Sequence, residues 1–250
     1  MRAEGGGRRA QVRGAGVGGV VKASLVGFVA LCVLLVGCRA ASAPASSMVP
    51  ASSDHAQVLV AIGASDAVGI GATNPDSDNW VARLGAKLPS GSRVVNLGIS
   101  GATAQQAEEQ ELPVAQDTAP TLAAVWLGVN DIEQNVSLDA FSANLTGVLS
   151  GLRQTGAKLF VGNLPDLRLL PAFNGRDPAA LDGLVRSWNA TIARIAGEQG
   201  ATLVDIYIAW GDVKDAKERA GLVSADGLHP TSAGYNRLAE LFWQAIDSAK

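Results

Sequence analysis

The segment Gln57–Gly71, QVLVAIGASDAVGIG, constrains the fold of this chain more than any other stretch. It opens with an uninterrupted apolar run, Val58–Ile62, which breaks at Gly63 and is followed by Ala64 and Ser65. Such a run predicts a buried strand, and glycine permits a tight turn that presents the next side chain at the carboxyl edge of a sheet. In open α/β sheets ligands bind at that edge, although an ordinary turn in which Ser65 caps the next helix would leave the same pattern.

Five short apolar runs recur along the chain, with stretches of helical spacing after them. The expected strands are Val58–Ile62, Arg93–Leu97, Leu122–Leu127, Lys158–Val161 and Thr202–Ile206. The expected helices include Asn79–Leu88, Leu138–Thr155, Pro178–Glu198 and Thr231–Ala249. Continuously hydrophobic strands that alternate with helices are typical of a parallel sheet covered on both faces. We therefore predict an α/β fold, a three-layer α/β/α sandwich, without an internal repeat or a second domain.

Two stretches fit poorly as regular elements: Pro165–Pro178, which is rich in proline, and Tyr207–Asp226. Both follow expected strands, and loops after strands lie at the ligand-binding edge. Their apolar side chains are therefore candidates for a substrate wall, although packing in the core would explain them equally well. These side chains are Leu167, Leu169, Leu170, Phe173, Tyr207 and Trp210.

Residues 1–37 differ in composition from the rest of the chain. Arginines and a lysine lie among glycines, and an apolar stretch without charge, Ser24–Gly37, then leads to Cys38. A basic segment followed by a short apolar one is typical of an export signal, and this stretch is too short to span a bilayer comfortably. Residues 38–55 are rich in Ala, Ser and Pro and predict a flexible tether, so we expect the folded domain at residues 56–250.

The end of the apolar stretch, LVGC at Leu35–Cys38, resembles a bacterial lipobox. The resemblance implies that the signal is cleaved before Cys38 and that this cysteine is lipidated. The protein would then be exported and lipid-anchored on the outer side of a bacterial membrane. The alternative is an uncleaved membrane anchor, and either interpretation places the domain outside the cytoplasm.

Charge and cysteine content restrict the partners of the folded domain. Residues 1–37 hold five of the 20 basic residues and one of the 23 acidic residues, so the remainder carries a formal net charge of −7. An acidic domain is a poor candidate for binding nucleic acid or an anionic membrane surface. Both cysteines, Cys32 and Cys38, lie in or at the end of the signal, which excludes disulfides and cysteine metal sites from the domain.

His229 is the one histidine expected inside the folded domain, because the other, His55, lies in the tether. It belongs to the sequence DGLHPTSAGY, with Asp226 three residues earlier. A serine hydroxyl needs a base to take its proton, and an imidazole needs an acid to hold its tautomer. Asp226 and His229 supply both, although a capping Asp and a surface His before a helix opened by Pro230 would give the same pattern.

Hydrogen-bond donors for an oxyanion also follow two of the expected strands. The second strand ends in NLGISGATA, where Gly98 and Gly101 allow backbone N–H groups to face a cleft. The third ends in LGVND, where Asn130 offers a side-chain amide, or where Asn130 and Asp131 form a simple turn. A serine, a glycine, an asparagine and a histidine at one sheet edge together favour a hydrolytic site.

Four motifs resemble, in order, the sequence blocks of the SGNH family of GDSL-type esterases and acylhydrolases. They are GASDAVG, NLGISG, GVND and DGLHP, and the resemblance covers nearly all of Val58–Ala249. The family fold is a flavodoxin-like sheet of five parallel strands, in agreement with the five apolar runs. The resemblance implies that Ser65 is the nucleophile and that His229 and Asp226 complete a catalytic triad.

The resemblance also implies an oxyanion hole built from the N–H groups of Ser65 and Gly101 and the side chain of Asn130. One position departs from the family, which has Asp directly before the serine, whereas this chain has Ala64 there and Asp66 just after. That Asp supports the turn and does not attack the substrate, so the departure concerns the fine positioning of the serine. Asp66 is a candidate substitute from the other side.

We therefore predict a serine hydrolase that cleaves carboxylic esters through an acyl-enzyme, without a metal or other cofactor. The first choice is a short-chain esterase or lysophospholipase, because the candidate wall is aliphatic and the enzyme is expected at a membrane. A carbohydrate O-deacetylase, whose glycan would stack on Trp and Tyr, is the runner-up. A non-catalytic lipoprotein that keeps the fold and binds a ligand is the alternative from another class. We expect a monomer that acts on a small ester, a lysolipid or an acylated glycan and does not bind nucleic acid.

Overall fold

The computed structural model describes residues 55–249 and contains one parallel sheet. Its five strands follow the order β2-β1-β3-β4-β5. They are β1 (Val58–Gly63), β2 (Arg93–Asn96), β3 (Leu122–Trp126), β4 (Lys158–Gly162) and β5 (Thr202–Val204). The expected strands begin at these same residues, and every pairing is parallel, so the predicted five-stranded parallel sheet is confirmed.

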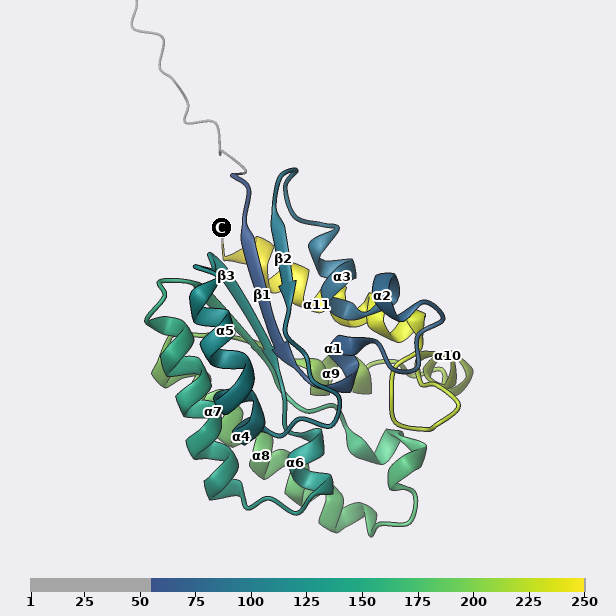
Figure 1. Ribbon diagram of the computed structural model, residues 1–250. Coiled ribbons are helices and arrows are strands. Elements are labelled where there is room, and N and C mark those ends of the chain that lie inside the picture. Colours follow the sequence, from purple (N-terminus) through teal and green to yellow (C-terminus); the bar gives the residue numbers. More distant parts are fainter. Residues whose placement is uncertain (1–54, 250) are drawn as a thin grey trace, which may run out of the picture. The chain divides into compact units, whose positions relative to one another are not determined.

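Helices cover both faces of the sheet (Figure 1). The α-helices are α1 (Ser65–Val68), α2 (Pro75–Asp78), α3 (Trp80–Gly85), α4 (Ala104–Gln106), α5 (Leu112–Asp117), α6 (Val129–Glu133), α7 (Leu138–Arg153), α8 (Pro178–Gln199), α9 (Ile206–Gly211), α10 (Ala216–Leu222) and α11 (Ser232–Ser248). A π-helical turn η1 (Ala107–Glu111) and the 3₁₀ turns η2 (Leu167–Leu169) and η3 (Pro171–Phe173) complete the helical elements of residues 55–249. Helices α4, α5, α7 and α8 pack on one face, and α3 and α11 on the other. This arrangement is the predicted three-layer sandwich.

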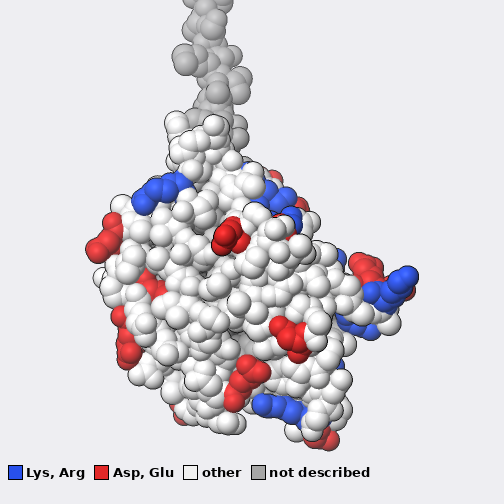
Figure 2. Space-filling model, turned by 45° about the vertical axis from the view of Figure 1, so that its right-hand side comes forward, with Lys and Arg blue, Asp and Glu red and all other residues white. Residues whose placement is uncertain are grey.

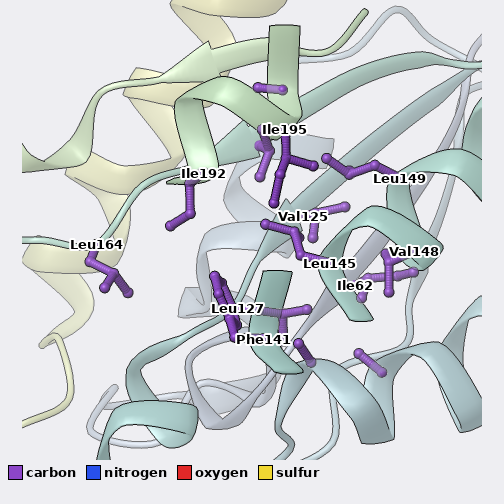
Figure 3. Packing of buried hydrophobic residues seen from close by; sticks show 14 of the residues in the cluster. Ile62, Val125, Leu127, Phe141, Leu145, Val148, Leu149, Leu164, Ile192 and Ile195 are labelled. Carbon is purple, nitrogen blue, oxygen red and sulfur yellow. The ribbon is translucent and has the colours of Figure 1, made fainter. Parts of the chain in front are cut away.

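Side chains of the buried strands alternate between two apolar clusters, because successive Cβ atoms along a strand point to opposite faces. Val60 and Ile62 of β1 join the cluster formed with α7 and α8, part of which Figure 3 shows. Leu59 joins the second cluster, in which Trp80 of α3 and Phe242 of α11 stack with ring centroids 4.7 Å apart. Burial of both faces explains why the strands read as continuous apolar runs in the sequence.

The stretch Tyr207–Asp226 contains most of helix α9 and all of α10, so the expectation that it is irregular is wrong. Both helices begin with an aspartate cap. The carboxylate of Asp205 accepts from the N–H of Ile208 at 3.1 Å, and that of Asp215 accepts from the N–H of Glu218 at 2.7 Å. Such caps satisfy donors that a helix leaves free at its first turn, and they make short helices possible without a long apolar period.

A helical segment that the apolar pattern did not indicate runs from α4 through η1 to α5. Thr103 begins it with a capping box, in which Gln106 Oε1 accepts from the N–H of Thr103 at 3.0 Å. Pro113 lies at the start of α5, where its missing N–H is tolerated. The segment matters for the site because it follows the loop that carries Gly101, and because π-helical turns are frequent at functional sites.

The predicted signal, Cys38 and the tether up to residue 54 lie outside the described residues. His55 is exposed at the start of the described chain, away from the predicted site. No helix within residues 55–249 is both long enough and apolar enough to cross a membrane. On the face shown in Figure 2, most of the surface is uncharged, and acidic and basic side chains lie singly or beside one another, as at the right-hand edge.

Candidate active site

Ser65 lies at the end of the interior strand β1, as the first residue of the short helix α1. Ala64 before it has φ −119° and ψ −143°, so the chain leaves the strand there before the helix begins. Gly69 ends the helix with φ +93°, a left-handed conformation that favours glycine. Strand and helix together hold Ser65 half-buried at the carboxyl edge of the sheet.

His229 meets Ser65 from the other end of the chain. Its Nε2 lies 2.8 Å from Ser65 Oγ, and its Nδ1 lies 2.8 Å from Asp226 Oδ2. The three side chains, predicted from separate motifs, are therefore joined in one row. Because the Asp226 carboxylate faces Nδ1, that nitrogen is assigned the proton, and the unprotonated Nε2 is left to accept from the serine hydroxyl.

The loop before α11 fixes Asp226 as an ionised acceptor. Its Oδ1 accepts from the hydroxyl of Ser224 at 2.8 Å and from the N–H groups of Leu228 and His229 at 2.8 and 2.9 Å. Partial burial alone would raise the pKa of Asp226, but these hydrogen bonds and the imidazole hold that pKa well below its usual range. The carboxylate is therefore charged and oriented before any substrate arrives.

The loop after β2 places two glycines for different physical reasons. Gly101 has φ +82°, and a Cβ there would meet no described atom within 4 Å, so backbone conformation rather than space requires glycine. A Cβ on Gly98 would lie 2.5 Å from the Cβ of Ala67, so this glycine allows the loop to approach α1 closely. The loop thereby carries Gly101 to the same sheet edge as Ser65.

Helix α6 holds this loop from the opposite side. Asn130 Nδ2 donates to the carbonyl of Ala102 at 3.0 Å, and Gln134 Nε2 donates to the carbonyl of Gly101 at 3.1 Å. An amide NH₂ has two donors, so one N–H of Asn130 orients the side chain and the second remains for the pocket that Asn130 lines. The hydrogen bonds of the described residues leave the N–H groups of Ser65 and Gly101 without an acceptor.

A small pocket with a free volume of about 60 Å³ opens beside the row of side chains. Ser65, Asn130 and His229 line it together with apolar residues. The largest apolar ones are Trp126, Leu127, Leu170, Ile206, Trp210 and Leu228. Four of these were not predicted, although Trp126, Leu127 and Ile206 stand where expected strands end and Leu228 precedes the predicted histidine.

The predicted apolar wall is correct for Leu170 and Trp210, which line the pocket, and wrong for the other candidates. Leu167 and Phe173 lie in the core cluster formed with α7 and α8, with 0% and 3% of their surfaces exposed. An apolar side chain that follows a strand has the same appearance in the sequence whether it faces a pocket or a core. The remaining candidates, Leu169 and Tyr207, pack against the core clusters, and the Tyr207 hydroxyl donates to Asp182 at 3.0 Å.

Comparison with known proteins relates this geometry to a family. The model of the GDSL-like lipase/acylhydrolase family matches residues 61–237, which is more than half of the chain. The chain belongs to this family. The predicted membership is therefore confirmed, and with it the esterase or acylhydrolase activity that the motifs indicated.

Relatives of the family show how far the similarity extends. Esterase TesA of Pseudomonas aeruginosa is 27% identical over 195 residues, which cover 76% of this chain and 88% of TesA. An acetylxylan esterase of Geobacillus stearothermophilus is 28% identical over 179 residues, which cover 66% of this chain and 78% of that enzyme. A crystal structure of TesA superposes with a TM-score of 0.63 at 26% identity, covering 77% of this chain and 99% of that structure.

This GDSL-like chain lacks the aspartate that the family has before its serine, and Asp66 bonds the same turn from the other side. Its Oδ1 accepts from the N–H of Ala64 at 3.1 Å, and its Oδ2 accepts from Trp80 Nε1 at 3.2 Å. Burial raises the pKa of Asp66 to about 6, against the opposing effect of these hydrogen bonds. The turn is thus held by a carboxyl group that follows the serine instead of preceding it.

Two further buried carboxyl groups support the site and were not predicted. Glu111 Oε2 accepts from the N–H of Gly63 at 3.0 Å, and both oxygens of Asp131 lie 3.1 Å from the N–H of Ala104. Burial raises the pKa of Glu111 to about 8 and that of Asp131 to about 6. Nothing in the apolar pattern distinguishes these two from the exposed acidic residues around them.

These carboxyl groups predict that the fold is more stable in mild acid than in mild base. Their pKa values in the folded protein exceed the ordinary values of 3.8 for Asp and 4.5 for Glu. Their contribution to the free energy of unfolding is therefore complete below the ordinary pKa values and is lost as pH rises to about 8. The melting temperature should fall between about pH 5 and about pH 9, and Glu111→Gln should flatten the part above about pH 6. A melting temperature that rises over this interval would contradict the assignment. Asp226 acts in the opposite sense, but only at lower pH.

Proposed function

We propose that Ser65, His229 and Asp226 are the catalytic triad of this ester hydrolase. The observation that carries the proposal is the row of contacts from Ser65 Oγ to His229 Nε2 and from His229 Nδ1 to Asp226 Oδ2, each 2.8 Å long. A serine hydroxyl is a weak nucleophile until a base within hydrogen-bond reach takes its proton. The same geometry is the main argument against a non-catalytic ligand-binding protein, because ligand binding alone does not need an oriented base beside a serine.

The reaction that follows from this row has two halves. Ser65 Oγ attacks the ester carbonyl carbon while its proton moves to His229 Nε2, and Asp226 stabilises the imidazolium. When the tetrahedral intermediate collapses, the bond to the alcohol oxygen breaks and His229 returns the proton to that oxygen. A water molecule, deprotonated by His229 in turn, then attacks the acyl-enzyme. When this second tetrahedral intermediate collapses, the bond to Ser65 Oγ breaks, His229 returns the proton to Oγ, and the carboxylic acid leaves.

The negative charge of the tetrahedral oxygen is stabilised by three donors in the proposed mechanism. They are the N–H groups of Ser65 and Gly101 and the second amide N–H of Asn130. Support comes from the two free backbone donors and from the hydrogen bond to Ala102, which already orients the amide. Donors fixed in advance need no reorganisation when the charge develops, which is why such sites lower the barrier strongly.

The pocket supports a short acyl chain as the preferred substrate group. Its free volume is about 60 Å³, and Leu170, Ile206 and Leu228 offer apolar surface to methyl or methylene groups. The similarity to an acetylxylan esterase favours a second candidate, removal of acetyl groups from a glycan. Trp210 gives that candidate little support by stacking, because only 3% of its surface is exposed.

A substrate panel separates the two candidates. We expect kcat/KM for simple esters to be highest with two to four acyl carbons, roughly the length that a pocket of this size admits. Acetylated xylo-oligosaccharides should be compared at equal concentration. A kcat/KM for the glycan that exceeds that for simple acetyl esters by on the order of tenfold would favour deacetylation. Highest activity on long-chain lysolipids would contradict the short-chain proposal.

The triad predicts that Ser65→Ala and His229→Ala each lower kcat by on the order of 10⁴-fold or more without unfolding the protein. The double variant should be hardly less active than either single variant, since the residues act as a unit. His55→Ala is the matched control, because that imidazole is exposed and precedes the first residue of β1, whereas Ser65 follows the last. Wild-type turnover by folded Ser65→Ala protein would refute the mechanism.

Asn130→Ala should lower kcat by on the order of 100 to 1000-fold with little change in KM, because the lost donor acts on the transition state. Gln134→Ala is the matched control, since Gln134, the C-cap of α6, also bonds the Gly101 loop but does not line the pocket. If both variants lose activity equally, Asn130 acts only by tying the loop. Melting temperatures measured alongside the kinetics exclude simple unfolding.

Export and lipid anchoring at Cys38 remain part of the proposal, supported by the sequence of residues 1–38. The protein should be recovered with the membrane fraction of the producing bacterium, and Cys38→Ser should release it if lipidation is the anchor. Unchanged recovery with the membrane after Cys38→Ser would indicate an uncleaved anchor. A fully soluble wild-type protein would contradict both forms of anchoring.

A further inference from the structure

Both backbone polar groups of Gly63, its carbonyl and its N–H, are hydrogen-bonded by the segment that carries Gly101. Its carbonyl accepts from the N–H of Ile99 at 3.2 Å, and its N–H donates to Glu111 Oε2 at 3.0 Å. Ile99 precedes Gly101 by two residues, and Glu111 closes the π-helical turn η1 that follows it. The loop is therefore attached to the nucleophile strand before and after its functional glycine, at a single residue two positions from Ser65.

Glu111 is an unusual choice for this attachment. Only 1% of its surface is exposed, and its Oε1 has no hydrogen-bond partner among the described residues. Glu109, on the same turn, is exposed and interacts with Gln105. Burying a carboxyl group with one oxygen unpaired is unfavourable, so a residue that served only the core would be expected to be apolar.

The ionisation of Glu111 is compatible with its position. Burial raises its pKa to about 8, so the carboxyl group is mainly protonated at neutral pH and places no full charge beside Gly63. Asp66 of α1 is the charged neighbour that acts on Glu111, and it raises that pKa further. A glutamine at this position would match the neutral acid in size and keep an oxygen acceptor.

We propose that Glu111 is a positioning residue for the oxyanion hole, whose buried carboxyl group sets the spacing between the turn that carries Ser65 and the loop that carries Gly101. The proposal rests on the function proposed above, because it assumes that the N–H groups of these two residues bind the same oxygen. Two donors on separate segments act together only if their distance is fixed. The Glu111 contact fixes this distance at Gly63, through a side chain that does not line the pocket.

The test separates the length of the side chain at position 111 from its acidity. Glu111→Gln keeps the reach to the N–H of Gly63 and should leave kcat within about threefold of the wild type. Glu111→Asp keeps the acid but withdraws it by about one bond length, 1.5 Å. It should lower kcat by roughly 10 to 100-fold with KM unchanged, since a displacement of this size at the reacting groups is costly. Glu109→Asp, a change on the exposed side of the same turn, is the matched control.

The outcomes separate positioning from other roles. Equal activity per folded molecule in Glu111→Asp and wild type would overturn the proposal, as would a loss in Glu111→Gln as large as that in Glu111→Asp. If Glu111→Asp does not fold, Glu111→Ala replaces it, and failure of both to fold would assign Glu111 to stability alone. Ser65→Ala, measured in the same assay, tests the catalytic mechanism independently. A failure of the proposed mechanism can therefore be told apart from a failure of the Glu111 proposal.

Discussion

The contact between Ser65 and His229 is the interaction on which the account of this protein depends. It joins residues 164 positions apart across 2.8 Å, and neither residue has a local reason to be near the other. The parallel sheet brings them together: β1 ends at the serine, and α11, which the histidine loop precedes, packs against the same sheet through Phe242 and its neighbours. The large buried core is therefore what keeps the Ser65 hydroxyl within hydrogen-bond reach of the His229 imidazole.

Support for the serine turn differs from the pattern of the family, and the difference is compensated locally. Where the family has an aspartate, this chain has Ala64, and the backbone of the turn is instead bonded by Asp66 and Glu111. Asp131 accepts from the N–H of Ala104 and so holds the start of α4, just after the loop that carries Gly101. In each case a buried or half-buried acid accepts from a backbone N–H near the site, so the Ser65 turn and the segment after Gly101 are fixed by acceptors that solvent does not reach freely.

Much of this architecture was predictable because it follows from burial. Interior strands that are covered on both faces must be apolar throughout, so the runs at β1, β3 and β4 were visible in the sequence, whereas the edge strand β2 is mostly exposed. The serine, His229 and Asn130 were visible because each stands where a strand ends or a late loop returns to the sheet edge. Short helices such as α9 and α10 were not, because capping by Asp205 and Asp215 replaces a long apolar period.

The remaining wrong or missing predictions have one physical source. The type of a residue does not determine whether its side chain points into the core, into a pocket or to solvent. Leu170 lines the pocket and Leu167 lies in the core, three residues apart in one loop. Glu111 is buried while Glu109 is exposed, because side chains two positions apart on a helical turn point to nearly opposite sides. Only the packed structure determines which of these side chains reaches the site.

The most direct measurement is covalent labelling of the native protein with a fluorophosphonate, followed by intact mass and peptide mapping. If His229 activates Ser65, the protein should gain one adduct, on the peptide that contains Ser65, and His229→Ala should label far more slowly. Labelling at another serine, or ester turnover that continues unchanged after Ser65 is fully modified, would contradict the account.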